Sequence, residues 1–588
     1  MFRNCYYDTR RNVMHVWEQL DGKDLYTKID WVPYVFVPGP GDIKSIDGVQ
    51  VVRKDFNTYY DYNDFCKSSM AYEDKVKPEI QFLTERYGLI PDEELLPPRL
   101  RNYFIDIEVL SNSETNIHGW KPEYAECPVT VVSIYDNITN KTTTFGLHPY
   151  TGKYSKEKFI DFIHCKTEET LLISFFNFIA RTPCDVISGW NVGQYDMPYL
   201  INRAKALFGE DTNLYNKFSP IGVVRMWERE GLYNIDIAGV HILDYMELYK
   251  WAAPKKAESY SLQFISNLEL DKSKVDYSEY KDLKTLYSEN WDLYVTYNII
   301  DALRVSQLEE KLGYIQQVQS LSLLTRVPLK FYKMVTNLLE GLFLVYLRRH
   351  GLCAPHMYGG SQEGYEGAFV KEPQRGMHQW VVSWDIVSSY PTAMITLNMS
   401  LETYFGRISG IEEQRVIEYV RKGNFPDFIM FKEGQGRVQF TGKKLETFNK
   451  ALEKRLLCVA PCGSVFSNKP AGVMSTVERE LFWRRVEMKD KMKRTKGTLP
   501  ELRGDNLSKA QEKVAQYNNL QNAYKTMLNS MYGALATPYS RWYNKNIAEA
   551  ITACGRHTIH MGVQYVNEIL NEPNEKMLEV LNDIKREI

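Results

Sequence analysis

The chain has 588 residues, of which 44% are apolar, 13% aromatic and 25% charged. This composition excludes a disordered protein, and the length exceeds what one hydrophobic core organises, so we expect roughly three to five domains. The formal net charge of −2 excludes a uniformly basic nucleic-acid binder, so any site for a polyanion has to be local.

The length of the apolar runs and the spacing of the cysteines indicate in which compartment the protein is expected. No apolar run approaches the ~20 residues of a membrane span, and the first residues lack the apolar core of a signal peptide. Nine cysteines occur without paired C-x-x-C spacing. We therefore expect a cytoplasmic protein with free thiols, no zinc site and no membrane partner.

The first hundred residues alternate apolar and polar positions in short segments broken by Pro-Gly and Asp-Gly turns. This pattern predicts small antiparallel β structure. An acidic, proline-rich stretch at 91–100 is predicted to connect this N-terminal module to the next domain.

The sequence NYFIDIEVL predicts a strand that carries Asp106 and Glu108 two residues apart, and hence on one face. Two adjacent carboxylates raise each other's pKa unless a cation lies between them. A metal site therefore competes with a solvated acidic face on an edge strand.

Two further segments carry acids. A strand at 185–188 leads through Asn191 to Asp196, just before a helix that begins with Pro198, so Asp196 is either a site residue or a helix N-cap. The sequence WDLYVTYNIIDALRVSQLEEKL predicts a long amphipathic helix with Tyr297 and Asp301 at i and i+4. The alternative for this last pair is an ordinary helix surface.

The set Asp-x-Glu, Asn-x₃-Tyr-Asp and Tyr-x₃-Asp resembles the three motifs of the DEDDy 3′→5′ exonucleases. The resemblance implies an RNase H-like mixed sheet on which Asp106, Glu108, Asp196 and Asp301 hold two Mg²⁺ ions, for which Mn²⁺ can substitute. In such a site one ion activates the attacking water and the other stabilises the leaving oxygen. The intervening sequence also resembles the proofreading domain of family B DNA polymerases, especially those of large tailed bacteriophages.

Helical sequence follows, and then two segments that resemble family B elements. Tyr358-Gly359-Gly360 resembles the loop that lies against template DNA, although a Gly-Gly turn is common. VVSWDIVSSYPTAM reads as a strand with one buried-looking carboxylate and resembles polymerase motif A. The resemblance implies that Asp385 binds the catalytic Mg²⁺ ions and that Tyr390 lies under the sugar and excludes a 2′-hydroxyl.

Residues 471–530 contain 12 Lys and Arg against 7 Asp and Glu. The capping-box spacing at 475–478 predicts a helix to about residue 494, and a second helix is expected from about 507 to 532. KTMLNSMYG resembles family B motif B at every defining position. That resemblance, against the alternative of a solvated surface, places three cations on the triphosphate and two residues near the nascent base pair: Arg485, Lys489, Lys525, Asn529 and Tyr532.

Family members continue into motif C, an Asp-Thr-Asp hairpin, and a DNA-gripping thumb. This sequence contains no Asp-x-Asp tripeptide and stops at Ile588, about where that hairpin is expected. We therefore expect a split polymerase, completed by a second polypeptide that carries motif C and the thumb. A tailored fragment, a damaged gene or a frameshift fits the same sequence.

These patterns predict a multidomain protein of α/β and α+β structure. Its predicted parts in chain order are a small mixed N-terminal domain (1–100), an RNase H-like exonuclease domain (101–313), a helical linker (314–356), the first part of an incomplete palm (357–470), helical-hairpin fingers (471–537) and a second part of the palm (538–588).

The function expected from the resemblance is DNA-templated DNA polymerisation with 3′→5′ proofreading in phage DNA replication, in the cytoplasm of a bacterial host. The expected partners are primer–template DNA, deoxynucleoside triphosphates and the motif C polypeptide, with a sliding clamp and a single-stranded-DNA-binding protein reached through it. The alternatives are a stand-alone exonuclease with an inactive polymerase remnant and a non-catalytic DNA-binding accessory protein.

Overall fold

The computed structural model describes residues 1–110, 117–154, 156–272, 275, 278–357, 364–378, 383–432 and 435–571. Contacts divide the chain into two compact units, one made of 1–33, 56–62 and 77–334, the other of 34–55, 63–76 and 335–588. No helix in the described ranges is both long and apolar enough to cross a membrane. All nine cysteines carry free thiols.

The N-terminal β structure is antiparallel, as predicted, but it does not form one module. Strands β1 (Phe2–Asp8), β2 (Val13–Leu20) and β3 (Lys23–Asp30) belong to the first unit and pack on helix α2 (Pro78–Tyr87). Strands β4 (Val35–Ser45) and β5 (Gln50–Lys54) belong to the second unit, because β4 pairs with the distant strand β14 (Leu352–Cys353). Pairing with residues 300 positions away is invisible to local patterns.

A six-stranded mixed sheet forms the centre of the first unit, in the order β13-β10-β6-β7-β8-β9. Strand β6 runs antiparallel to β7 and parallel to β10. The strands are β6 (Asn102–Val109), β7 (Val129–Asp136), β8 (Lys141–Gly146), β9 (Ile160–His164), β10 (Val186–Ser188) and β13 (His241–Ile242). The predicted mixed sheet is therefore present.

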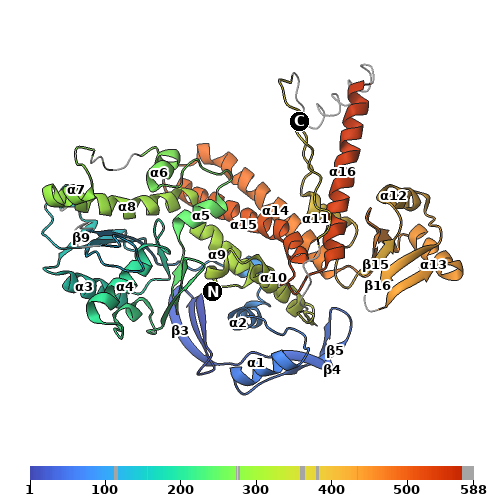
Figure 1. The fold of residues 1–588 in the computed structure, drawn as a ribbon, viewed down its shortest axis with the longest axis horizontal. Coiled ribbons are helices and arrows are strands. Elements are labelled where there is room, and N and C mark those ends of the chain that lie inside the picture. Colours follow the sequence, from blue (N-terminus) through green and yellow to red (C-terminus); the bar gives the residue numbers. More distant parts are fainter. Residues whose placement is uncertain are drawn as a thin grey trace. The chain divides into compact units, whose positions relative to one another are not determined.

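Helices cover both faces of this sheet (Figure 1). Helices α3 (Glu168–Arg181) and α4 (Asp196–Phe208) pack on one face, and α8 (Trp291–Leu312) packs on the other. The remaining elements of this unit are η1 (Asp92–Glu94), η2 (Leu214–Phe218), β11 (Val224–Arg229), β12 (Leu232–Ile237), α5 (Tyr245–Ala252), α6 (Leu262–Leu270), α7 (Leu283–Glu289), α9 (Tyr314–Thr325) and η3 (Leu329–Phe331).

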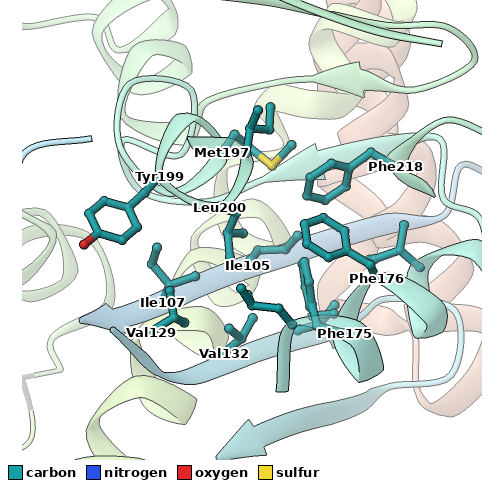
Figure 2. Packing of buried hydrophobic residues seen from close by; sticks show 14 of the residues in the cluster. Ile105, Ile107, Val129, Val132, Phe175, Phe176, Met197, Tyr199, Leu200 and Phe218 are labelled. Atoms are coloured by element: carbon teal, nitrogen blue, oxygen red, sulfur yellow. The ribbon is translucent and has the colours of Figure 1, made fainter. Parts of the chain in front are cut away.

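The core on the α3 and α4 face decides which way β6 presents its acids. Ile105 and Ile107 are buried among Phe175, Phe176 and Leu200 (Figure 2). Because side chains alternate along a strand, Asp106 and Glu108 point to the opposite face, where α8 lies. The burial of two isoleucines thus orients two carboxylates.

The second unit combines a small sheet with long helices. Its antiparallel sheet has the order β17-β16-β15-β19-β18, and helices α12 and α13 enclose a core on it. Helices α14 and α15 pack along each other, so the predicted pair of helices forms a hairpin (Figure 1). The elements are β15 (Tyr404–Ser409), α12 (Glu413–Lys422), β16 (Phe428–Lys432), β17 (Gly436–Phe440), α13 (Gly442–Glu453), β18 (Leu457–Val459), β19 (Ser464–Ser467), α14 (Val473–Thr498), η4 (Leu499–Glu501) and α15 (Gly504–Ala536), besides α10 (Val335–Arg349), α11 (Ser389–Thr396) and α16 (Lys545–Asn571). Helix α1 (Tyr59–Ser68) is shared between the two units.

The predicted capping box at the start of the fingers is wrong. Helix α14 begins at Val473, so Ser475 lies inside it, and its hydroxyl donates to Asn398 Oδ1 at 2.6 Å. The first backbone N–H groups of the helix instead reach acceptors outside it, with Val473 N donating to Glu402 Oε1 at 2.5 Å and Met474 N to Ser400 Oγ at 3.1 Å. Side chains from another segment satisfy the helix end, which makes a local cap unnecessary.

The strand expected at motif A is also absent from residues 383–386, while 381 and 382 lie outside the described residues. Asp385 is exposed rather than buried. An apolar run becomes a strand only where a neighbour completes its hydrogen bonds, and no described strand pairs with these four residues.

Candidate active sites

The loop after β10 brings Asp196 to β6. Strand β10 ends at Ser188, and the chain passes over β6 at Gly189, where a Cβ atom would lie 2.5 Å from Ile105 O. Past the point where the chain crosses β6, the N–H of Ile107 donates to Asp196 Oδ1 at 3.1 Å. Asp196 therefore bonds to the backbone between Asp106 and Glu108, rather than capping its own helix.

Asp244 holds this loop in place and was missed by sequence reasoning. Its carboxylate accepts from Asn191 N at 3.2 Å and Gly193 N at 3.0 Å, and it caps helix α5 through Met246 N at 3.0 Å. Asn191 takes a φ of 67°, which Asn tolerates better than most residues. The sequence shows Asp244 directly before a helix, which indicates a helix cap. Its contact with the loop at 191–193 depends on the tertiary structure.

Helix α8 carries the third motif, and it begins and ends at the residues that the sequence predicts. Tyr297 and Asp301 are both buried, one turn apart. The neighbouring Asn298, also missed from sequence, donates from Nδ2 to Asp106 Oδ2 at 2.7 Å. This bond ties the helix of the third motif to the strand of the first.

Burial controls the charge of this region. Asp196 is 3% exposed, and burial raises its pKa to about 7, against two backbone N–H bonds that lower it. Burial likewise raises the pKa of Asp244. Buried acids of this kind favour a cation beside them.

The four acids do not form a closed metal cage as they stand. In the described ranges, no group of three or more His, Cys, Asp or Glu side chains has the spacing to hold a metal ion. Carboxylates without a cation between them repel one another, which favours separated side chains. Their donor set nevertheless fits Mg²⁺, since it contains carboxylate oxygen and neither sulfur nor imidazole.

Motif A and motif B meet in the second unit. The rings of Tyr390 on α11 and Tyr532 on α15 lie 4.9 Å apart between centroids. The hydroxyl of Tyr532 bonds that of Tyr365 at 2.7 Å. Helix α16 packs closely behind, because a Cβ on Gly555 would lie 3.2 Å from Tyr390 Cε1.

The remaining fingers residues follow the predicted helical spacing. Lys489 on α14 and Lys525 and Asn529 on α15 are exposed, as a binding surface requires. Arg485 is half-buried, and burial lowers its pKa. The predicted loop residues Tyr358, Gly359 and Gly360 lie outside the described residues.

One arginine joins four segments of the second unit. Arg541, 1% exposed, donates to Glu340 Oε1 of α10 at 2.7 Å, to Asp74 Oδ1 at 3.1 Å and to Pro355 O at 2.7 Å. Asp74 also accepts from Met357 N at 3.0 Å. This ionic network ties the segment after α15 to α10, to Asp74 and to the chain directly before residue 358.

Two family models match this chain. Residues 53–265 match the model of the DNA polymerase family B exonuclease domain, and residues 330–587 match that of DNA polymerase family B. The two models describe parts of one family and occur in the predicted order. The chain belongs to DNA polymerase family B, which confirms the predicted family and fold class.

Individual relatives are distant in sequence. The DNA-directed DNA polymerases of Escherichia phage RB69 and Enterobacteria phage T4 are 26% and 24% identical to this chain, over 94% and 95% of its length. A DNA polymerase of Archaeoglobus fulgidus is 24% identical over 88% of the chain and 54% of its own length. The chain spans 65% and 66% of the two phage proteins, just under two thirds.

Proposed function

We propose that the chain carries a 3′→5′ exonuclease and the first part of a DNA-templated DNA polymerase of phage DNA replication. One observation supports the exonuclease most: the three predicted motifs, which are spread along the sequence from Asp106 to Asp301, meet at β6. Asp196 bonds to Ile107 N and Asn298 of α8 bonds to Asp106, each within 3.1 Å.

In this proposal Asp106, Glu108, Asp196 and Asp301 hold two Mg²⁺ ions, with Mn²⁺ as a substitute. The ions would supply an activated water and charge stabilisation at the leaving oxygen. Asn298 keeps Asp106 oriented, and Tyr297, one turn before Asp301, orients the water that attacks the terminal phosphodiester. Because burial raises the pKa of Asp196 to about 7, a cation beside it would favour the ionised carboxylate at neutral pH.

The polymerase centre is proposed around Asp385, which would bind Mg²⁺. Tyr390 lies under the sugar of the incoming nucleotide, and its contact with Tyr532 supports a shared wall. Fixed cations offset phosphate charge. The triphosphate is proposed to meet Arg485, Lys489 and Lys525, with Asn529 beside the base pair and Tyr358, Gly359 and Gly360 against the template.

Two-metal phosphoryl transfer needs more than one carboxylate. We propose that the further carboxylates come from a polypeptide carrying motif C and a thumb, through which a sliding clamp and a single-stranded-DNA-binding protein are reached. The substrates are primer–template DNA and deoxynucleoside triphosphates, in the cytoplasm of a bacterial host.

A stand-alone exonuclease is the second candidate. It is favoured by the contrast between the two sites, since the acids of the exonuclease motifs are largely buried and bonded while Asp385 is exposed. In that case the second unit contributes DNA binding without nucleotidyl transfer.

A mismatched primer–template with Mg²⁺ and nucleotides tests both candidates. We expect the chain to remove the mismatched 3′ nucleotide, and Asp106→Ala with Glu108→Ala to abolish removal. The exposed pair Glu210→Ala with Asp211→Ala is the matched control. Degradation that survives the first double variant contradicts the exonuclease assignment.

Primer extension separates the candidates from each other. Extension only after addition of a motif C polypeptide supports the split polymerase. Extension by the chain alone contradicts the need for a second polypeptide, and no extension under either condition leaves the stand-alone exonuclease.

A further inference from the structure

A cavity of about 450 Å³ opens in the first unit, away from the proposed catalytic acids. Its walls include Arg101, Asp185 and Gly239, which stand before the parallel strands β6, β10 and β13. Asp106 and Glu108 lie further along β6, and Asp196 follows the end of β10. The cavity and the acids are therefore at opposite ends of the central strands.

The lining of this cavity carries an excess of positive charge. Four arginines, Arg3, Arg99, Arg101 and Arg181, face two acids, Asp24 and Asp185. Arg3 uses both acids, donating to Asp185 at 2.8 and 2.6 Å and lying 2.6 Å from Asp24. Arg3 thus contacts both carboxylates, and the four arginines exceed the two acids by two positive charges.

The other arginines remain available to a ligand. Arg99 and Arg181 are exposed, and neither has an ion-pair partner in the part of the chain that is described. Arg101 is 3.7 Å from Asp136, too far for a short charge-assisted bond. Up to three guanidinium groups can therefore turn to an anion.

The wall beside these arginines is closely packed and partly aromatic. Trp17 packs against Gly239, where a Cβ would lie 2.7 Å from the indole and from Pro220. Gly239 has a φ of +90°, which disfavours any side chain there. Asp185 is held in turn by Arg101 N at 2.7 Å. A wall of this kind suits the flat, apolar face of a base.

We propose that this cavity binds the phosphate of a nucleotide, with Arg99, Arg101 and Arg181 as its cationic ligands and Trp17 beside the base. Guanidinium forks match phosphate oxygens in pairs, and the volume is within the range of about 300–1,000 Å³ that holds small ligands. The choice of a nucleotide rests on the proposed function, whereas the choice of a phosphate rests on the lining alone.

Calorimetric titration in EDTA, where no catalysis occurs, tests the site. The probes are thymidine 5′-monophosphate, the oligonucleotide (dT)8 and inorganic phosphate, each added to the full chain. Arg99→Ala with Arg181→Ala is expected to weaken nucleotide binding by about tenfold or more. Arg10→Ala with Arg11→Ala, in the β1–β2 turn at the far end of that hairpin, removes the same charge and should change binding less than twofold.

The probes identify the source of the phosphate. If Arg99→Ala with Arg181→Ala weakens binding of the monophosphate, the ligand is a free nucleotide. If this variant weakens binding of (dT)8 alone, the ligand is a phosphodiester within a strand. If only inorganic phosphate responds, the nucleotide assignment is overturned. If all three probes bind the two double variants equally, the site itself is overturned, whatever the exonuclease assay shows.

Discussion

The side-chain amide of Asn298 donates to Asp106 Oδ2 at 2.7 Å, and this bond connects helix α8 to strand β6 across 192 residues of sequence. Metal ligands are commonly oriented by such outer partners, whose loss typically costs about 10–100-fold in activity or metal affinity. Asn298 is completely buried, so it orients Asp106 without touching solvent.

Asn298→Ala is expected to lower the exonuclease rate by about 10–100-fold, because Asp106 loses the bond that fixes its rotamer. The rate of single-turnover release of a 3′ nucleotide measures the effect. The control is Asn234→Ala, whose amide donates to Leu232 O within β12. An unchanged rate in Asn298→Ala, with the fold intact, contradicts a positioning role.

Gly189→Ala is expected to destabilise the first unit by about 1–3 kcal/mol, the usual cost of overpacking, and to reduce exonuclease activity. Its Cβ would lie 2.5 Å from Ile105 O, a backbone atom that cannot move aside. Gly193→Ala is the matched control in the same loop, since its nearest atom would be Asp244 Oδ2 at 3.5 Å. Chemical denaturation of both variants provides the comparison, and equal stability would refute the crossing constraint.

Arg541→Met is expected to lower the free energy of unfolding of the second unit by about 3–5 kcal/mol, because it removes the buried guanidinium that bridges Asp74 and Glu340. Arg415→Met, at an exposed position of α12, should change it by less than about 0.5 kcal/mol. Urea denaturation followed by fluorescence measures both. If Arg541→Met lowers the free energy of unfolding only slightly, other groups stabilise the two carboxylates.

Glu478 on α14 is expected to make the free energy of unfolding depend on pH. It is completely buried, both of its carboxylate oxygens lack a hydrogen-bond partner within the described chain, and burial raises its pKa well above 4.5. Below about pH 4.5 it is protonated whether the chain is folded or unfolded. As the pH rises further, only the unfolded chain releases the proton, so folding loses up to about 1.4 kcal/mol per pH unit until the raised pKa is reached.

Glu478→Gln removes this titration, so its melting temperature relative to the parent chain should rise between pH 4.5 and 8. Glu487→Gln, at an exposed position paired with Lys491, should show a difference that hardly changes with pH. A constant difference for Glu478→Gln across this range would show that Glu478 does not titrate as burial predicts.

The sequence by itself determined the elements whose causes are local. The period of apolar residues marks α8 from Trp291 to Leu312, and alternation marks β6 with Asp106 and Glu108 on one face. The spacing of Lys525, Asn529 and Tyr532 needs only a regular helix, which α15 is. Periodicity and spacing express short-range geometry, so one sequence carries them.

Only the tertiary structure decided which distant groups meet. Asp244 contacts the loop before Asp196, Asn298 contacts Asp106, and Arg541 joins Asp74 to Glu340, all through contacts that no local pattern encodes. For the same reason the helix cap at Val473 came from residues 400–402, and the apolar run at motif A formed no strand at 383–386. Hydrogen bonds and ion pairs between distant segments depend on how the chain packs, and a strand depends on its neighbour.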